Sequence, residues 1–250
     1  MIYYFSGTGN SFDAARRLTG ADEEMVDIAS LPLEGDIDCI LEEGEALGFV
    51  FPVYYAGIPS IVKDFVPRLK LPGKASYVYA VITCGGNIYG AGDMLGKELR
   101  KSGISLDAVY SLLMPDNYVI MYKIEEEEKR DEILAAAREE IKEIQSRVAA
   151  REKTPWAKNV FSKLATAFLY PAYEKARKTD KFWIDDQCIG CATCVNRCPA
   201  KAMAMKDGHP TWIKDKCIHC MSCIRCGAVQ YGKSTVGRKR YTNPVLKSCH

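Results

Sequence analysis

Eight of the eleven cysteines of this 250-residue chain lie within one stretch of 39 residues, and they constrain the fold more than any other feature. They form two runs, Cys188-Ile-Gly-Cys191-Ala-Thr-Cys194-Val-Asn-Arg-Cys198-Pro199 and Cys217-Ile-His-Cys220-Met-Ser-Cys223-Ile-Arg-Cys226. Two-residue gaps let three thiolates of one loop reach three corners of a single 4Fe-4S cube, whereas the longer gap and the proline carry the fourth cysteine toward a second cube. A zinc site needs only four ligands, and here eight are offered in interleaved order. The spacing therefore favours two iron–sulfur clusters over structural zinc or disulfides.

The cysteine runs resemble the two-cluster bacterial ferredoxins over roughly residues 182–235. The resemblance implies that one cluster is held by Cys188, Cys191, Cys194 and Cys226, and the other by Cys198, Cys217, Cys220 and Cys223. The second run departs from the pattern, because Cys226 follows Cys223 after two residues instead of three and Gly227 replaces the proline. Either Cys226 is the ligand in a rearranged loop, which we favour, or the fourth ligand is missing and that cluster is a three-iron, labile or absent centre.

Length and charge indicate a two-domain protein with dissimilar halves. A chain of 250 residues exceeds the usual single-domain size. Residues 1–154 hold 17 Lys and Arg against 26 Asp and Glu, whereas residues 181–250 hold 12 against 4. The basic residues either offset the charge of the clusters or let the two halves dock on each other or attract different partners. No nucleic-acid recognition motif accompanies them, so nucleic-acid binding is not expected.

The chain shows no signal peptide and no stretch long enough to span a membrane. Thiolate ligands fit a reducing compartment, so we predict a cytoplasmic protein. The oligomeric state cannot be predicted from the sequence.

The N-terminus has the pattern of a phosphate-binding loop. A strand-length apolar segment, Met1 to Phe5, is followed by Ser6-Gly-Thr-Gly-Asn10-Ser11 and by a helical stretch from Phe12 to Leu18. Glycines let backbone N–H groups turn inward, hydroxyls donate, and the helix N-terminus adds partial positive charge. The loop matches neither the nucleoside-triphosphate nor the dinucleotide glycine motif. It is therefore either the site of a monophosphate or a tight turn with no ligand.

Strands and helices then alternate along the N-terminal half, which predicts an α/β doubly wound parallel sheet of five strands. The later strands are expected at 25–28, 46–51, 77–82 and 104–113, and the helices at 60–69, 91–102 and from the acidic run at 125–128 onward. In such sheets ligands bind beyond the carboxyl ends of the strands, where the loops after the first, third and fourth strands meet. The candidate cofactor-binding residues in these loops are Ser6, Gly7, Thr8, Gly9, Asn10, Ser11, Pro52, Tyr54, Tyr55, Ala56, Gly57, Thr83, Cys84, Gly85, Gly86, Asn87, Tyr89 and Gly90.

Residues 1–152 resemble the flavodoxins, which bind FMN. Phe5-Ser-Gly-Thr-Gly-Asn-Ser11, Phe51-Pro-Val-Tyr-Tyr55 and Ile61-Val-Lys-Asp-Phe65 carry the resemblance. Together with the cysteine runs, the whole chain resembles the flavodoxin–ferredoxin fusion proteins of anaerobic bacteria. The resemblance implies a flavodoxin-like FMN domain and a small α+β ferredoxin-like domain at 182–235 with two 4Fe-4S clusters. Tyr54 and Tyr55 would flank the flavin, and the glycines would let backbone approach its ring.

Two segments lie outside these domains. An amphipathic helical linker is expected at 153–181, because Trp156, Val160, Leu164 and Phe168 recur every four residues and can pack on the sheet or bridge the domains. The basic tail at 236–250 either wraps back over the body or contacts a redox partner.

The sequence thus predicts an electron-transfer flavoprotein that relays electrons between FMN and the clusters and exchanges them with a redox protein. One alternative is an FMN-dependent reductase of a small organic substrate that is fed by its clusters. Another is a zinc-binding or sensor protein. No acid–base pair or nucleophile stands out as catalytic.

Overall fold

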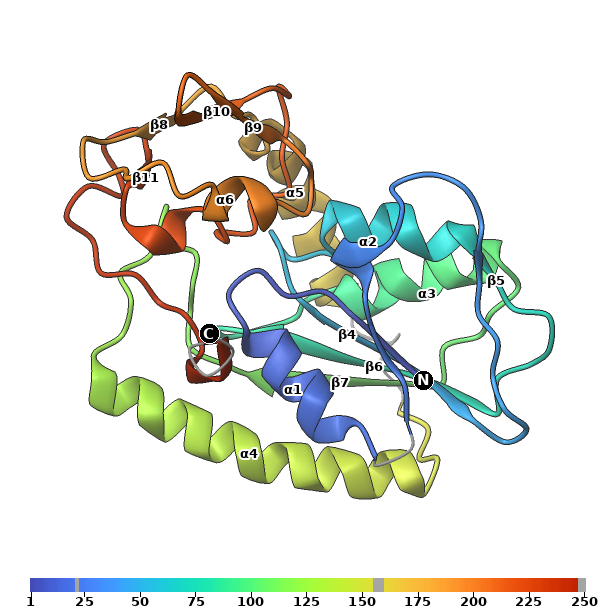
Figure 1. The fold of residues 1–250 in the computed structure, drawn as a ribbon. Helices are drawn as coiled ribbons and strands as arrows, with labels where there is room; N and C mark the ends of the chain where they lie inside the picture. The colour runs from blue at the N-terminus through green and yellow to red at the C-terminus, as the bar shows by residue number, and fades with distance from the viewer. Residues whose placement is uncertain (21–22, 155–159, 247–250) are drawn as a thin grey trace.

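The computed structural model describes residues 1–20, 23–154 and 160–246 (Figure 1). Five parallel strands form the central sheet: β1 (Ile2–Tyr4), β2 (Met25–Asp27), β4 (Ala46–Pro52), β6 (Tyr77–Cys84) and β7 (Ala108–Leu113). Their spatial order is β2-β1-β4-β6-β7. Counted within the sheet this is the order 2-1-3-4-5 of the flavodoxin-like folds, so the predicted fold class is confirmed. A minor parallel pair, β3 (Ile37–Asp38) and β5 (Leu69–Lys70), lies beside the main sheet.

Helices cover both faces of the sheet, because each central strand is apolar on both sides. α1 (Asn10–Leu18) and α4 (Glu127–Ala149) lie on one face, and α2 (Ser60–Phe65) and α3 (Ala91–Lys101) lie on the other (Figure 1). All eight residues of β6 are buried, and they alternate between the two cores. Such a continuous apolar run is typical of a strand in a parallel sheet that is covered on both faces.

The C-terminal part is built from two short antiparallel pairs. β8 (Phe182–Ile184) pairs with β11 (Val229–Tyr231), and β9 (Met203–Lys206) pairs with β10 (His209–Trp212). The turn between β9 and β10 contains Asp207 and Gly208, both with positive φ, which is the favoured chemistry of a two-residue hairpin. The short α6 (Thr193–Asn196) completes this small α+β unit.

The linker helix is α5 (Val160–Ala176), but the prediction of its packing face is wrong. Val160, Leu164 and Phe168 are 64–85% exposed, and the buried residues are Thr166 and Tyr173. Trp156 lies outside the described residues. The helix is apolar on nearly every side, so the spacing of its apolar residues alone could not identify the packed face. The face that packs is the one that carries Thr166 and Tyr173, whose hydrogen bonds reach both domains. Across the described part of the chain, no helix combines the length and the apolar character that a membrane span requires.

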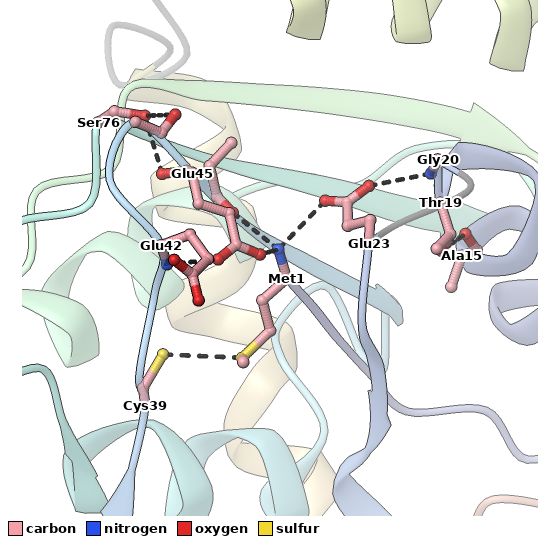
Figure 2. A network of polar contacts seen from close by, with 11 residues as sticks. Met1, Ala15, Thr19, Gly20, Glu23, Cys39, Glu42, Glu45 and Ser76 are labelled. Atoms are coloured by element: carbon pink, nitrogen blue, oxygen red, sulfur yellow. Dashed lines mark hydrogen bonds and ion pairs between the residues drawn. The ribbon is translucent and has the colours of Figure 1, made fainter.

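Carboxylates hold the first strand at its start (Figure 2). The Met1 amino group contacts Glu45, lies 3.3 Å from Glu23 and donates to the Ala46 carbonyl at 3.0 Å. Burial favours the neutral form of Glu45, but hydrogen bonds from the Met1 amino group and the Glu42 N–H outweigh this and lower the pKa of the carboxyl. The ionised carboxylate therefore stabilises the folded state.

Glu45→Gln is expected to lower the free energy of unfolding at neutral pH by about 0.5–1 kcal/mol. Because the folded-state pKa is depressed, this stabilisation is present above the unfolded-state pKa and is lost as the pH falls through the folded-state value. Urea unfolding at a series of pH values should show that the free energies of unfolding of wild type and Glu45→Gln become equal in acid. Glu43→Gln, which changes an exposed neighbour, should have no such effect. If the free energies of unfolding of wild type and Glu45→Gln still differed in acid, the ionised Glu45 carboxylate would not be the source of the stabilisation.

Candidate functional site

A cavity of about 620 Å³ lies at the carboxyl edge of the parallel sheet. Its volume is within the range of small-molecule and cofactor pockets. Fifteen of the eighteen candidate cofactor residues line it: Ser6, Gly7, Thr8, Asn10, Ser11, Pro52, Tyr54, Tyr55, Ala56, Thr83, Cys84, Gly85, Gly86, Asn87 and Tyr89. Gly9, Gly57 and Gly90 lie outside its lining. The structure thus brings the three predicted loops together around one cavity.

The loop at residues 6–9 is fixed by internal hydrogen bonds. Gly9 has φ +104°, a left-handed conformation that favours glycine, and its N–H donates to Ser6 Oγ at 3.1 Å. Asn117 Nδ2 donates to Thr8 Oγ1 at 2.5 Å, and the hydroxyls of Ser11 and Thr83 are 2.8 Å apart. No side chain caps the first turn of α1, so its N–H groups remain available to an anion in the cavity.

The basic tail packs against the other side of this loop. Asn243 N–H donates to the Thr8 carbonyl at 2.8 Å, and the side chains of Asn243 and Leu246 lie against Gly9. Asn10 Oδ1 accepts hydrogen bonds from Tyr241 Oη at 2.8 Å and Asn243 Nδ2 at 3.1 Å. Asn10 Nδ2 donates to the Pro115 carbonyl at 2.9 Å. The Asn10 side chain therefore joins three segments and is not free to bind a ligand.

Asn243→Ala is expected to destabilise the protein by about 1–2 kcal/mol, because it removes a buried hydrogen bond to Asn10 and the acceptor for Val245 N–H. The unfolding midpoint at a fixed FMN concentration measures this loss. Asn196→Ala is the matched control, since Asn196 is exposed and its side chain makes no hydrogen bond to another described residue. Equal midpoints for the two variants would contradict a structural role for the tail.

The two tyrosines after β4 lie in a strained turn. Tyr54 and Gly57 exchange backbone hydrogen bonds of 2.8 and 2.9 Å, and the two residues between them, Tyr55 and Ala56, have φ of 49° and 62°. Two positive φ values define a type I′ turn, which normally contains asparagine or glycine. Strain of this kind, about 1–3 kcal/mol per residue, is concentrated at functional sites. The turn holds Tyr55 in the cavity wall.

Two of the three glycines outside the lining serve helix packing instead. A Cβ on Gly57 would collide with the ring of Tyr170 of α5, and one on Gly90 would lie 2.7 Å from Thr166 Oγ1. Thr166 accepts a hydrogen bond from the Gly90 N–H at 2.9 Å and donates to the Ala56 carbonyl at 2.6 Å. These glycines therefore seat the linker helix close to the cavity loops.

Sequence reasoning missed part of the lining. The loop after β7 contributes Met114, Pro115, Asp116, Asn117, Tyr118, Met121 and Tyr122, and the remaining residues are Val53, Leu169, Ala172, Tyr173 and His219. The first group could have been found, because β7 ends at the same edge as the other strands. Tyr173 could not, since its place depends on how α5 docks.

A second, small cavity is lined by four thiols, those of Cys198, Cys217, Cys220 and Cys223, which we term the inner thiols. Burial raises the pKa of Cys217 to about 11 and that of Cys220 to about 12, so both are neutral unless a metal deprotonates them. The sulfurs of Cys198 and Cys217 accept N–H bonds of 3.3 Å from Ala202 and His219. Four thiols around a cavity, with N–H donors to sulfur, suit a cluster.

The other four cysteines, Cys188, Cys191, Cys194 and Cys226, are termed the outer thiols. Burial and the nearby thiols of Cys226 and Cys188 raise the pKa of Cys194, which shows that these three lie together. Cys226 reaches this group from a short 3-10 turn at Ile224–Cys226, and Gly227 (φ +89°) reverses the chain after it. Within the described ranges, no three His, Cys, Asp or Glu side chains converge tightly enough to hold a single ion.

The two cysteine loops repeat one backbone conformation. In the first loop the second and fourth residues after Cys188, Gly190 and Ala192, have φ of 68° and 58°. In the second loop the equivalent residues after Cys217, His219 and Met221, have φ of 57° and 64°. Three non-glycine residues therefore adopt a conformation that L-residues disfavour by roughly 1–2 kcal/mol each. The strained positions therefore lie between the cysteines of both loops.

The inner-thiol cavity and the larger cavity share one wall. His219 lines both of them. Its Nδ1 lies 3.1 Å from Tyr118 Oη, which is 2.8 Å from Tyr55 Oη. Burial lowers the pKa of the ring to about 4, against the opposing effect of the Lys178 backbone carbonyl, so the ring is neutral near pH 7. Gly7 touches the Cys220 carbonyl, so the residue 6–9 loop and the inner cysteine loop are in direct contact.

Comparison with known proteins identifies one region. Residues 181–226 match the 4Fe-4S dicluster domain family. No curated protein matches the sequence.

Similar solved structures share low sequence identity with this chain. They include a putative flavoprotein from Bacteroides uniformis (18% identity, 45% of this chain and 88% of that chain covered, TM-score 0.36). A Trp repressor binding protein from Bacillus subtilis has 14% identity, with 55% and 94% covered and a TM-score of 0.31. A flavodoxin from Streptococcus pneumonia TIGR4 has 15% identity, with 57% and 96% covered and a TM-score of 0.33. The fold assignment rests on the strand order instead.

Proposed function

We propose that this chain, which joins a flavodoxin-like sheet to a 4Fe-4S dicluster domain, is an electron-transfer flavoprotein that relays electrons between FMN and two 4Fe-4S clusters. The observation that carries the proposal is the shared wall, where His219 lines both the large cavity and the cavity of the inner thiols. Electron transfer needs cofactors held close together, and one chain with adjoining sites provides that proximity.

The large cavity has the groups that FMN requires. The uncapped first turn of α1 and the hydroxyls of Ser6 and Thr8 can hold a phosphate with neutral donors. Tyr55 and Tyr89 supply aromatic surface, and the backbone at Gly85 and Gly86 can approach a ring edge. When bound, a flavin accepts two electrons and releases them singly, whereas a 4Fe-4S cluster passes one at a time.

Tyrosine side chains lie against the cysteine loop that carries His219. Burial and the nearby thiols of Cys220 and Cys217 raise the pKa of Tyr54 well above its usual value, so its hydroxyl stays protonated. Tyr173 is fully buried and donates to the Ile218 carbonyl at 2.8 Å, which fixes the loop that carries His219. Tyr118 holds the imidazole through Nδ1. These contacts orient the loop with no proton transfer required.

The proposal is tested on protein that has been purified and reconstituted without oxygen. Iron, zinc and FMN per chain are measured first, and about eight irons and one FMN are expected. The flavin is then reduced by illumination with a sacrificial donor, and bleaching of the cluster absorption is followed. The first-order rate constant of this bleaching should not change when the protein is diluted about tenfold, because the exchange is intramolecular. Zinc without iron, or clusters that stay oxidised beside reduced flavin, would contradict the relay.

A reductase is the second candidate, and the mouth of the large cavity favours it. Tyr89, Met121, Tyr122 and Leu169 line the cavity and are 37–56% exposed, so apolar surface surrounds its opening. Such a rim could admit a small organic substrate. Steady turnover of an added nitroaromatic or quinone, with flavin reduction matching product, would identify an enzyme rather than a carrier.

A further inference from the structure

The two sets of thiols differ in what they face. The inner thiols adjoin the large cavity through His219, and Cys198 and Cys220 are buried. Not one of the outer thiols lines that cavity, and Cys191 and Cys226 are exposed. If electrons move between flavin and clusters, the inner site is the neighbour of the flavin and the outer site is the end of the relay that reaches the surface.

The residues beside the outer thiols in the sequence include one exposed aliphatic side chain and two arginines, as well as Asp185 and Asp186. Ile189, between Cys188 and Cys191 in the sequence, is 87% exposed, although it is a large aliphatic residue. Arg197 and Arg225 lie close enough for the charge of Arg197, together with burial, to lower the pKa of Arg225, while the Cys226 thiol acts in the opposite direction. Among the described residues, neither arginine has a carboxylate within ion-pair distance.

Resting on the proposed function, we propose that the surface formed by Ile189, Arg197 and Arg225 around Cys191 and Cys226 docks an acidic one-electron redox protein. Unpaired guanidinium groups at the rim of an apolar contact attract a partner of opposite charge and orient it during encounter. Each encounter passes a single electron, so the donor is oxidised and the acceptor reduced by one with no bond made or broken. The acidic character of residues 1–154 disfavours docking of the same partner there.

The arginines could instead only offset the charge of the outer cluster. Reversing the charges of Arg197 and Arg225 distinguishes the two explanations. A docking role alters the rate with a charged partner and its salt dependence, whereas a local role alters cluster loading and leaves partner discrimination unchanged.

The experiment measures second-order electron exchange by stopped flow between the reconstituted chain and two probes, an acidic plant-type 2Fe-2S ferredoxin and a basic c-type cytochrome. With the acidic probe, the rate should fall about tenfold between low and high salt. Arg197→Glu/Arg225→Glu should lower the low-salt rate about tenfold and improve exchange with the basic probe. Lys97→Glu/Arg100→Glu on α3, away from α6 in Figure 1, reverses the same number of charges and should change the rate far less.

Iron content, FMN content and the cluster EPR spectrum must match wild type in both double variants. If the arginine variant loses iron, Ile189→Glu replaces it, because that side chain is exposed; its iron content must also match wild type before a loss of exchange with the acidic probe is assigned to docking. Equal effects of the α3 and arginine pairs, or a rate independent of salt, would overturn the docking site. Each of these results leaves flavin-to-cluster exchange intact, so failure of the docking site is distinguishable from failure of the relay.

Discussion

Replacing Gly7 with alanine is expected to destabilise the folded protein by about 3 kcal/mol and to weaken FMN binding at least about tenfold. A Cβ at this position would collide with the carbonyl oxygen of Cys220 and would lie 3.0 Å from the Cys220 Cβ. Both obstacles belong to the backbone or the Cβ of Cys220, so no flexible side-chain end can move aside. The residue 6–9 loop and the inner cysteine loop would have to separate.

Thermal unfolding and a flavin fluorescence titration measure the two effects of Gly7→Ala. Gly73→Ala is the control, because a methyl group added there would have no atom within 4 Å and the φ of Gly73 is ordinary. Normal stability and normal flavin affinity in Gly7→Ala would show that the two loops do not touch in solution. The proposal that the cofactor sites share a wall would then lose its main support.

Cys226→Ala is expected to remove about half of the bound iron and to leave the inner cluster in place, because each 4Fe-4S cluster needs its own four ligands. Cys198→Ala should also remove about half of the bound iron, but from the inner site. EPR spectra of the reduced proteins distinguish the remaining clusters. Cys39→Ala should retain all of the iron, since Cys39 is fully buried in the core of the N-terminal half.

The Cys226 experiment also decides between the two explanations of the shortened second run. Full iron in Cys226→Ala would exclude Cys226 as a ligand. A three-iron centre at the outer site of the wild-type protein would likewise indicate that Cys226 does not supply the fourth ligand. The nearby positions of Cys188, Cys194 and Cys226 favour Cys226 as a ligand, and hence the loss of iron in Cys226→Ala.

Much of the architecture could be predicted from local pattern. The buried run Tyr77–Cys84 and the glycine-rich loop before α1 identify a parallel sheet and its binding edge, because each depends only on residues close in sequence. Boundaries were less certain: β7 begins at Ala108 rather than at residue 104, and α1 already begins at Asn10. In α4 the buried residues include Leu134 but not its neighbour Ile133, and the helical period alone does not separate two adjacent aliphatic residues.

The contacts between the halves could not be predicted. Tyr173 reaches the Ile218 carbonyl only because α5 packs with its exposed aromatic residues outward. His219 lies between two cavities because Gly7 allows the cysteine loop to approach. Both depend on the relative placement of segments far apart in sequence, for which hydrophobic spacing carries no information.

The docking of the tail on the residue 6–9 loop has a consequence for biosynthesis. The hydrogen bonds of Asn10 to Tyr241 and Asn243 join residues 231 and 233 positions apart. Domains generally fold from the N-terminus as they leave the ribosome, so the first strand, loop and helix emerge long before these partners exist. Until the tail is translated, Pro115 is the remaining partner among the three described residues that hydrogen-bond the Asn10 side chain. The loop at the edge of the large cavity therefore acquires its final contacts only after the cysteine loops have been translated.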